Sequence, residues 1–531
     1  MDAKNAIESG KAILGIELGS TRIKAVLTDP SGKPIAQGSH EWENKLVDGL
    51  WTYSTDDVWH GMRQCYESLQ ADVRRLYDTD IENLAAIGVS AMMHGYLPFD
   101  KEGRILTPFR TWRNTNTGQA AKKLSDLFVY NIPLRWSISH LYQAILNGEE
   151  HVSEIDFITT LAGYVHWQLT GRKVLGIGDA SGMIPVDPET GTYHKRMVDE
   201  FDRLVEGSPL RHKLSDILPE VLNAGEKAGE LTAEGAMRLD PTGHLRPGVP
   251  FCPPEGDAGT GMVATNAVLP RTGNVSAGTS SFSMIVLDKE LSKPYEMIDI
   301  VTTPDGHPVA MVHCNNCTSD LNAWIGMFRE FLTLMGADAE TGEIFSRLYN
   351  KALEGDADCG GLVSYNFVSG EPVVGLEEGR PLFVRSASDR FGLANFMRAN
   401  LYAAVAVLKI GNDVLFNEEH VKVDRITGHG GFFKTPGVGQ RVLAAALSSP
   451  ISVMETAGEG GAWGIALLAG YMVNNPDGLT LPEYLDKVIF LGDKGTEIAP
   501  TREEIEGFDA YIANYQAGLA IEQAAVKAKK I

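Results

Sequence analysis

Short apolar runs alternate with longer amphipathic runs along this chain. Residues 13–29 read ILGIELGSTRIKAVLTD, which predicts two strands on either side of a small polar turn. Further strands are predicted at AAIGVSAMM, GNVSAGTSSFSMIVL and RITGHGGFF, and helices at DVWHGMRQCYESLQADVRRL and ANLYAAVAVLKIGNDVLF. This alternation predicts an α/β protein whose sheets are mostly buried.

The turn between the first two predicted strands carries more donors than a tight hairpin needs. Asn-Gly or Asp-Gly would close such a hairpin, whereas here a glycine and two hydroxyls, Gly19-Ser20-Thr21, stand at the tip. Glu17 precedes them and Lys24 follows. The combination suits a phosphate and its metal ion.

A fainter copy of this pattern appears in the second half of the chain. TGNVSAGTSSFSMIVLD, at residues 272–288, repeats strand, Gly-Thr-Ser, strand and acidic residue. Two such hairpins predict a duplicated structure that binds one phosphate chain from both sides. The alternative is that they are two unrelated, ordinary hairpins with similar sequences.

Length, composition and charge restrict the class of protein. A chain of 531 residues is too long for one core and favours two large domains, with a crossover at the Pro- and Gly-rich residues 239–261. The formal charge of −22 argues against nucleic-acid and anionic-membrane partners. The N-terminus lacks the apolar region of a signal peptide, and no apolar run reaches the ~18 residues that span a bilayer. We therefore expect a cytoplasmic protein, with Cys314 and Cys317 as reduced structural thiols.

Three further segments offer chemistry. Asp257 lies between glycines in GDAGTGM, where the backbone can approach a ligand, although Gly-Asp is also a common structural turn. Met93 and His94 end a predicted strand ahead of Trp112, which suits a polyol-binding wall. From Ile426 the chain reads strand, glycine turn, helix, twice over. Neither turn has dinucleotide or P-loop spacing, so a nucleotide would bind in another way.

Taken in order, these motifs resemble the FGGY family of carbohydrate kinases over nearly the whole chain. GIELGSTRIKA resembles its first phosphate hairpin, SAMMHGYLPFD the sugar segment of its xylulokinases, and GDASGMIPVD its D-A-S stretch. EGDAGTGM resembles the catalytic loop, NVSAGTSS the second phosphate hairpin, and GHGGFFKTP and GEGGAWGIALLAG the adenosine segment. NCTSDLNAWIGMF is closer to the ribulokinases.

The resemblance implies a fold and its division into domains. The fold is the two-domain actin-like ATPase (ribonuclease H-like) fold, with ATP and sugar meeting in a cleft between the domains. Residues 1–253 would form the N-terminal domain, which holds the sugar segment and the first hairpin. Residues 254–531 would form the C-terminal domain, which holds the catalytic loop, the second hairpin and the adenosine segment. A homodimer is expected from the family's habit.

The resemblance also implies an activity and its residues. The reaction is transfer of the γ-phosphate of ATP to a hydroxyl of a ketose, such as the pentulose xylulose, with Mg²⁺ as the metal. Asp257 is the implied base, and with Glu17 the implied metal ligand. The implied phosphate contacts are Ser20, Thr21, Lys24, Gly278 and Thr279. The implied adenosine contacts are Gly430, Gly431 and Gly461, and the implied sugar contacts are Met93, His94, Trp112, Asn114 and Asp257.

Departures from the family pattern keep other functions open. Glu17 stands where the family usually has Asp, and Asn114 and Asn116 stand at the Asp and Arg of its W-x-D-x-R pattern. Because losing one partner of a buried ion pair would leave a charge unpaired, the double change favours altered substrate choice. The alternatives are a non-catalytic sugar or nucleotide sensor, and an actin- or Hsp70-like ATPase, which would not need MMHG and TWRN.

Overall fold

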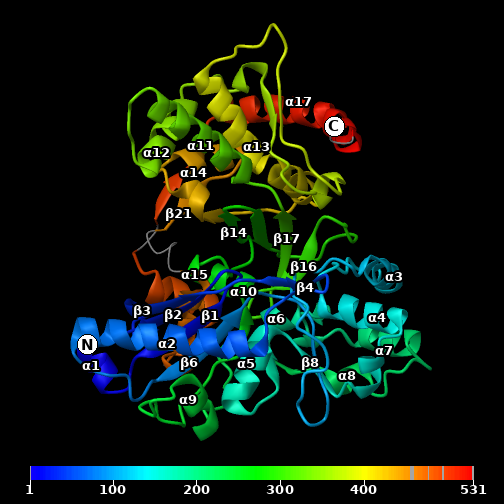
Figure 1. Cartoon of the computed structure of the whole chain (residues 1–531), viewed down its shortest axis with the longest axis vertical. Helices are drawn as coiled ribbons and strands as arrows, with labels where there is room; N and C mark the ends of the chain where they lie inside the picture. The colour runs from blue at the N-terminus through cyan, green and yellow to red at the C-terminus, as the bar shows by residue number, and fades with distance from the viewer. Residues whose placement is uncertain (1, 455–459, 476, 493–494, 529–531) are drawn as a thin grey trace. The chain divides into compact units, whose positions relative to one another are not determined.

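The computed structural model describes residues 2–454, 460–475, 477–492 and 495–528 (Figure 1). The chain forms two compact units. Unit 1 comprises residues 1–269, 299–309 and 459–492, and unit 2 comprises residues 270–298, 310–458 and 493–531. This division differs from the expected boundary at 253/254, because residues 254–269 stay with unit 1 and two later segments return to it.

Unit 1 is an α/β unit whose elements come from the N-terminal half of the chain and from the returning segments. Its strands are β1 (Ile13–Leu18), β2 (Arg22–Thr28), β3 (Pro34–Glu41), β4 (Lys45–Val47), β5 (Leu50–Thr52), β6 (Ala86–Ala91), β7 (Leu97–Phe99), β8 (Phe157–Thr159), β9 (Val174–Gly176), β10 (Val186–Asp187), β11 (Thr192–Tyr193), β12 (Glu220–Leu222), β13 (Glu255–Gly256) and β16 (Asp299–Thr302). Its helices are α1 (Ala3–Glu8), α2 (Thr55–Tyr77), α3 (Gly118–Phe128), α4 (Ser137–Asn147), α5 (Leu161–Thr170), α6 (Ile177–Ala180), α7 (Lys195–Leu204), α8 (Leu214–Ile217), α9 (Ala233–Leu239), α10 (Asp257–Ala264), α15 (Gly460–Val473) and α16 (Leu481–Tyr484).

The main sheet of unit 1 has the strand order β13-β6-β1-β2-β3. β1 pairs antiparallel with β2, as the polar turn between two apolar runs predicted. On its other side β1 pairs parallel with β6, and β6 pairs parallel with β13. The carboxyl ends of three parallel strands therefore lie at one edge of the sheet.

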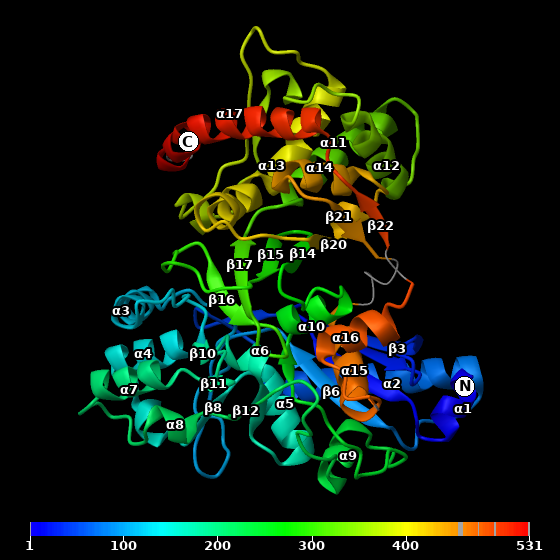
Figure 2. The ribbon, with the colours of Figure 1, turned by 180° about the vertical axis from the view of Figure 1, so that it is seen from behind.

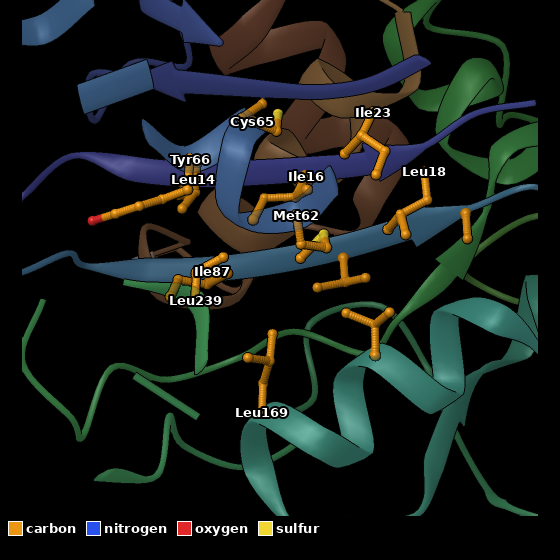
Figure 3. Close-up of a cluster of buried hydrophobic side chains, with 14 of the residues drawn as sticks. Leu14, Ile16, Leu18, Ile23, Met62, Cys65, Tyr66, Ile87, Leu169 and Leu239 are labelled. Atoms are coloured by element: carbon orange, nitrogen blue, oxygen red, sulfur yellow. The ribbon is translucent and has the colours of Figure 1, made fainter. Parts of the chain in front are cut away.

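The two faces of this sheet are covered by different parts of the chain. Side chains alternate between the faces of a strand, so Leu14, Ile16 and Leu18 share one face of β1. They belong to the large apolar cluster that Figure 3 shows in part, which also includes Met62 of α2 and Leu239 of α9. This face is the hydrophobic core of unit 1.

The opposite face of β1 packs against α15, which comes from the C-terminal part of the chain (Figure 2). A Cβ built on Gly15 would lie 2.0 Å from the carbonyl oxygen of Ala462 and 2.9 Å from the Cβ of Ala466. Only glycine allows this approach, because a side chain would overlap the backbone of the helix. The glycine in the first predicted strand thus brings a segment more than four hundred residues away onto the sheet.

Unit 2 is a second α/β unit. Its strands are β14 (Thr272–Ala277), β15 (Ser281–Val286), β17 (Pro308–Cys314), β18 (Val363–Tyr365), β19 (Leu382–Val384), β20 (Arg425–His429), β21 (Ile451–Val453) and β22 (Thr496–Ile498). Its helices are α11 (Ser319–Leu334), α12 (Thr341–Ala352), α13 (Leu393–Asp413), α14 (Val438–Leu447) and α17 (Arg502–Lys527).

The faint repeat in the sequence is a repeat of sheet topology. In unit 2, β14 pairs antiparallel with β15 and parallel with β20, and β20 pairs parallel with β21, in the order β17-β15-β14-β20-β21. This is the arrangement of β3-β2-β1-β6-β13 in unit 1. The second glycine turn expected after β21 falls at residues 455–459, outside the described residues.

One helix of unit 2 is long and apolar. Among the described residues, only Leu393–Glu418, which contains α13, has the length and hydropathy of a membrane span, although no such run was expected. Since 78% of its apolar window is buried inside the protein, it has the character of a core helix. The five cysteines are buried free thiols, as expected for Cys314 and Cys317.

Candidate functional site

The carboxyl ends of β1, β6 and β13 gather most of the predicted residues of unit 1. Glu17 lies near the end of β1 and the turn Gly19–Thr21 follows that strand. Met93 and His94 follow β6, and Asp257 follows β13. In open α/β sheets, ligands bind at the carboxyl ends of parallel strands. The topology thus brings these residues to one edge.

The turn at the end of β1 is held from one side by aromatic residues. The indole N–H of Trp42 donates to the Gly19 carbonyl (2.7 Å), and the Tyr53 hydroxyl donates to the Ser20 carbonyl (2.6 Å). The backbone N–H of Trp42 donates to the Thr21 carbonyl (3.1 Å). The two rings stack with centroids 4.1 Å apart.

These three bonds decide where the amides of the turn point. Across a trans peptide, a carbonyl and the following N–H point in opposite directions, and the described residues contain no cis peptide. The N–H groups of Ser20 and Thr21 therefore point away from the aromatic side. Ser20 is partly exposed and Thr21 is exposed. Successive amides that point to the same side can form an anion-binding nest.

Asp257 is the first residue of α10, directly after β13. Its Oδ1 accepts the backbone N–H of Met93 at 3.2 Å. Part of its surface is open to solvent, yet the surrounding protein raises the pKa of its carboxyl to about 6 by desolvation. A carboxylate poised near neutral pH and reachable from outside can accept a proton from a bound hydroxyl.

Glu17 lies on the face of β1 that meets α15. Its Oε2 accepts the N–H of Ala462 at 3.0 Å, at the amino end of that helix, where negative charge is favoured. Burial and the charge of Asp257 raise the pKa of Glu17 to about 7. A Cβ on Gly461 would lie 2.6 Å from Glu17 Oε1, so the missing side chain of Gly461 makes room for this carboxylate.

Two further acids, Asp179 and Glu255, lie beside Asp257 and were given no role from sequence. Glu255 accepts the N–H groups of Gly178 (3.3 Å) and Asp179 (2.9 Å), and Asp179 Oδ2 accepts the Thr160 hydroxyl at 2.6 Å. Both side chains are buried, and desolvation raises their pKa values, that of Glu255 to about 8 and that of Asp179 to about 7. With these raised pKa values both acids are partly protonated at neutral pH, which reduces the negative charge beside Asp257.

The predicted sugar residues pack around the same strand ends. His94 has a φ of 68°, in the left-handed region, and its Nδ1 lies 3.0 Å from the Gly182 carbonyl oxygen. A Cβ on Gly256 would lie 2.1 Å from Met93 Cγ, so Met93 fills the space beside the catalytic loop. The half-buried Trp112 donates its indole N–H to the Ser20 hydroxyl oxygen at 3.1 Å.

Asn114 and Asn116 do not form a pair. The Asn114 amide accepts the N–H of Trp51 (2.9 Å) and donates to the carbonyls of Trp51 (2.8 Å) and Thr111 (3.0 Å). Asn114 is 4% exposed, whereas Asn116 is exposed. The amide at 114 thus binds its own segment to β5, and the interpretation of the two asparagines as a matched replacement for a buried ion pair has no structural counterpart.

Unit 2 repeats the construction of the hairpin. The N–H groups of Cys317 and Thr318 donate to the carbonyls of Thr279 and Gly278, each at 3.0 Å. This bonding turns the following amides the other way, as in the first hairpin. Gly430, which follows β20, has a φ of 101°, and a Cβ there would lie 2.5 Å from the Ala277 carbonyl oxygen. A Cβ on Gly278 or Gly431 would meet nothing within 4 Å.

Sequence reasoning missed residues that position or adjoin the predicted site residues. Trp42 and Tyr53 set the direction of the amides, and Asp179 and Glu255 adjoin Asp257. The one signal for the aromatic pair was the concentration of aromatic residues soon after the hairpin. Nothing in the local spacing shows that their donors reach Gly19 and Ser20.

The comparisons with known proteins agree with this architecture. Residues 12–263 match the N-terminal domain of the FGGY family of carbohydrate kinases, and residues 273–473 match its C-terminal domain. With its duplicated sheets and the acid at the end of the third parallel strand, the protein is a two-domain carbohydrate kinase of the actin-like ATPase fold. The chain belongs to the FGGY family.

Two related sequences, both of xylulose kinases, are distant from this chain. The xylulose kinase of Haemophilus influenzae is 22% identical over 477 residues, which is 84% of this chain and 91% of that enzyme. The xylulose kinase of Escherichia coli is 23% identical over 53% of this chain, and the match spans only 55% of that enzyme.

Solved structures extend the likeness of fold. A ligand-bound xylulose kinase and a gluconate kinase, both from Lactobacillus acidophilus, each have a TM-score of 0.78 at 17% and 18% identity, and each comparison covers 97% of this chain and 99% of the other. Plasmodium falciparum glycerol kinase with ADP has a TM-score of 0.75 at 14% identity, over 96% of this chain and 98% of that one. Because these names differ in the acceptor, the fold alone does not identify the substrate.

Proposed function

We propose that this protein transfers the γ-phosphate of ATP to a hydroxyl of a neutral ketose, most readily a pentulose such as xylulose. The observation that carries the proposal is the edge of the unit 1 sheet where the amide nest at Ser20 and Thr21 and the carboxylate of Asp257 follow parallel strands. The xylulose kinases among the relatives support the pentulose as acceptor.

Asp257 acts as the base in this reaction. Its Oδ1 is oriented by the Met93 N–H, and its pKa of about 6 leaves it mostly ionised at neutral pH. It accepts the proton of the acceptor hydroxyl as the oxygen attacks the γ-phosphorus, and the bond to the β-phosphate oxygen breaks to release ADP. Most of the catalysis lies in alignment and charge neutralisation, since phosphoryl transfer asks little covalent chemistry of the protein.

The remaining nucleotide contacts belong to the same proposal. Ser20, Thr21 and Lys24, with Gly278 and Thr279, bind phosphate oxygens, and Gly430, Gly431 and Gly461 lie along the adenosine. Both hairpins support this assignment, because each has its carbonyls bonded on one side and its following amides free to face an anion.

The acids of unit 1 fit Mg²⁺. Glu17 and Asp257 are near enough for the charge of Asp257 to raise the pKa of Glu17, and Mg²⁺ takes one or two protein carboxylates together with waters and substrate phosphates. The described residues contain no group of three His, Cys, Asp or Glu side chains arranged for a metal. When bound, Mg²⁺ neutralises phosphate charge, and Glu17 and Asp257 would hold it.

The acceptor is neutral in this proposal. The segment of Trp112 offers an indole, and the charged pair of the family pattern is absent from this segment. A carboxylate on the substrate would therefore gain no partner from Asn114 or Asn116. A cytoplasmic location and a homodimer are further parts of the proposal, and light scattering on the purified chain measures the second.

A phosphotransfer assay tests the function. ATP, Mg²⁺ and a panel of ketoses, polyols and sugar acids are mixed with the protein, and sugar-dependent ADP is measured. We expect ADP with a pentulose, and Asp257→Asn to lower turnover about 10²–10⁴-fold, the usual contribution of a positioned base. The exposed Asp126→Asn is the matched control. ADP release that ignores every sugar would instead indicate an ATPase, and binding without ADP release a sensor.

A further inference from the structure

Trp112 contacts the hairpin at Gly19–Thr21 and is itself one of the predicted sugar residues. Its indole N–H donates to Ser20 Oγ at 3.1 Å, although the two residues are far apart in sequence. Trp112 is half-buried and packs against the core cluster of unit 1 with part of its surface accessible. One side chain thus bonds to a predicted phosphate residue and is itself predicted to contact the sugar.

The hydrogen bond from Trp112 leaves the Ser20 hydroxyl able to donate its proton. A serine hydroxyl has one proton to donate and two lone pairs, and an indole N–H can only donate. Trp112 therefore occupies a lone pair of Ser20 Oγ and leaves its proton for another acceptor. The carbonyls of Gly19, Ser20 and Thr21 already accept from Trp42 and Tyr53. An anionic oxygen bound in the nest can accept this proton.

The segment that carries Trp112 is fixed at its far end. The three hydrogen bonds of Asn114 tie it to the backbone of Trp51 in β5 and to Thr111. Arg113 adds a contact, with its guanidinium carbon 3.8 Å from the centre of the Trp51 ring. Because Asn114 holds the backbone of this segment, a ligand that packs on the indole of Trp112 mainly restricts the motion of that side chain and of its N–H.

We propose that Trp112 couples the binding of the acceptor sugar to the phosphate hairpin, by holding the Ser20 hydroxyl in the orientation that donates to a phosphate of ATP. The inference rests on the proposed function, because it needs a sugar on the indole and a phosphate in the nest. A sugar that orders the indole strengthens its bond to Ser20 and thereby the binding of ATP. By linkage, ATP strengthens sugar binding by the same factor.

Calorimetric titration of the full chain measures this coupling. The dissociation constant of β,γ-methylene ATP with Mg²⁺ is determined with and without D-xylulose, and the ratio is the coupling factor. For the unsubstituted protein we expect a factor of about 5 or more, the lower end of typical couplings. Trp112→Phe keeps an aromatic ring and removes the N–H, and we expect its coupling factor to fall to about 1.

Two further variants keep the test decisive. Ser20→Ala removes the same bond from the other side, and the Trp112→Phe/Ser20→Ala double variant should lose no more coupling than either single variant. Trp59→Phe is the matched control, because it loses an indole hydrogen bond of 3.1 Å to Tyr164 in the core. It should keep the full coupling factor.

The outcomes separate the two proposals. Full coupling in Trp112→Phe and Ser20→Ala would overturn the inference, and so would independent binding of ATP analogue and xylulose to the unsubstituted protein. Absence of any sugar-dependent ADP in the phosphotransfer assay would instead refute the proposed function. If Trp112→Phe does not fold, Ser20→Ala alone decides the question.

Discussion

Replacing Asn114 by aspartate tests whether this residue serves the architecture of its segment. The substitution keeps the shape and the oxygen that accepts from Trp51 N–H, and removes the Nδ2 group that donates to the carbonyls of Trp51 and Thr111. Asn114 is 4% exposed, so the new carboxyl would be a buried group next to two carbonyl oxygens. The family pattern has aspartate at this position. A loss of stability in Asn114→Asp would therefore be a property of this chain and its hydrogen bonds to Trp51 and Thr111.

The size of the loss follows from the two hydrogen bonds that are removed. Each carbonyl keeps a backbone partner, since the Trp51 carbonyl also accepts the N–H of Thr111 (3.2 Å) and the Thr111 carbonyl that of Asn114 (3.0 Å). Two lost bonds at about 0.5–1.5 kcal/mol each lower the free energy of unfolding by about 1–3 kcal/mol, and the buried carboxylate adds to this loss because it faces the same two carbonyl oxygens. A central value of about 2 kcal/mol corresponds to a fall in Tm of about 3 °C for a unit of roughly 310 residues, and the buried carboxylate increases it. Asn116→Asp, at an exposed position, should change the free energy by less than about 0.5 kcal/mol.

Differential scanning calorimetry of both variants, with hydrogen exchange at residues 50–52, measures the effect. Asn114→Asp should melt well below Asn116→Asp at neutral pH, and the amides of β5 should exchange faster. The gap should narrow in acid, because a protonated carboxyl recovers one donor. Equal melting temperatures at neutral pH, with unchanged exchange at Trp51, would show that the amide is not the structural bond described here, and would favour its assignment to the sugar.

Two predictions concern the acids of unit 1. Asp257 must be ionised to act as a base, and its pKa is raised to about 6. The value of kcat/KM for the sugar should therefore fall about tenfold per pH unit below about pH 6, and Asp257→Asn should not show this fall. Acid unfolding does not explain this fall in kcat/KM. A carboxyl whose pKa is raised by folding stabilises the folded state when it is protonated, and this contribution is lost as pH rises. The same fall in both proteins would contradict the assignment of Asp257 as the base. Glu17→Gln keeps an oxygen that accepts the N–H of Ala462 but removes the negative charge. The Mg²⁺ concentration for half-maximal rate should therefore rise. An unchanged concentration would show that Glu17 serves only to bind α15 to the sheet.

The two asparagines show where reasoning from motifs reaches its limit. A comparison of letters placed Asn114 and Asn116 together, because their counterparts in the family pattern carry opposite charges. In the structure one side chain is buried and bonded to the backbone of Trp51, and the other is exposed. Whether two neighbouring positions share an environment depends on the direction of each side chain, and sequence spacing in a loop does not determine that direction.

Local patterns were sufficient for the α/β class, the two hairpins and the family. Strand periodicity and a short polar turn predict β1 and β2 because side-chain alternation and turn chemistry are properties of adjacent residues. The repeat at residues 272–288 is equally local, and its strands have the topology expected of a duplicate.

Only the tertiary structure decided how distant segments meet. The return of residues 459–492 to unit 1, where α15 packs on Gly15 and receives Glu17, depends on a close approach that no pattern near either segment encodes. The same holds for the donors of Trp42, Tyr53 and Trp112 that reach the first hairpin. Hydrogen bonds and packing between such segments arise from the three-dimensional path of the chain, whereas the sequence records directly only what neighbouring residues prefer.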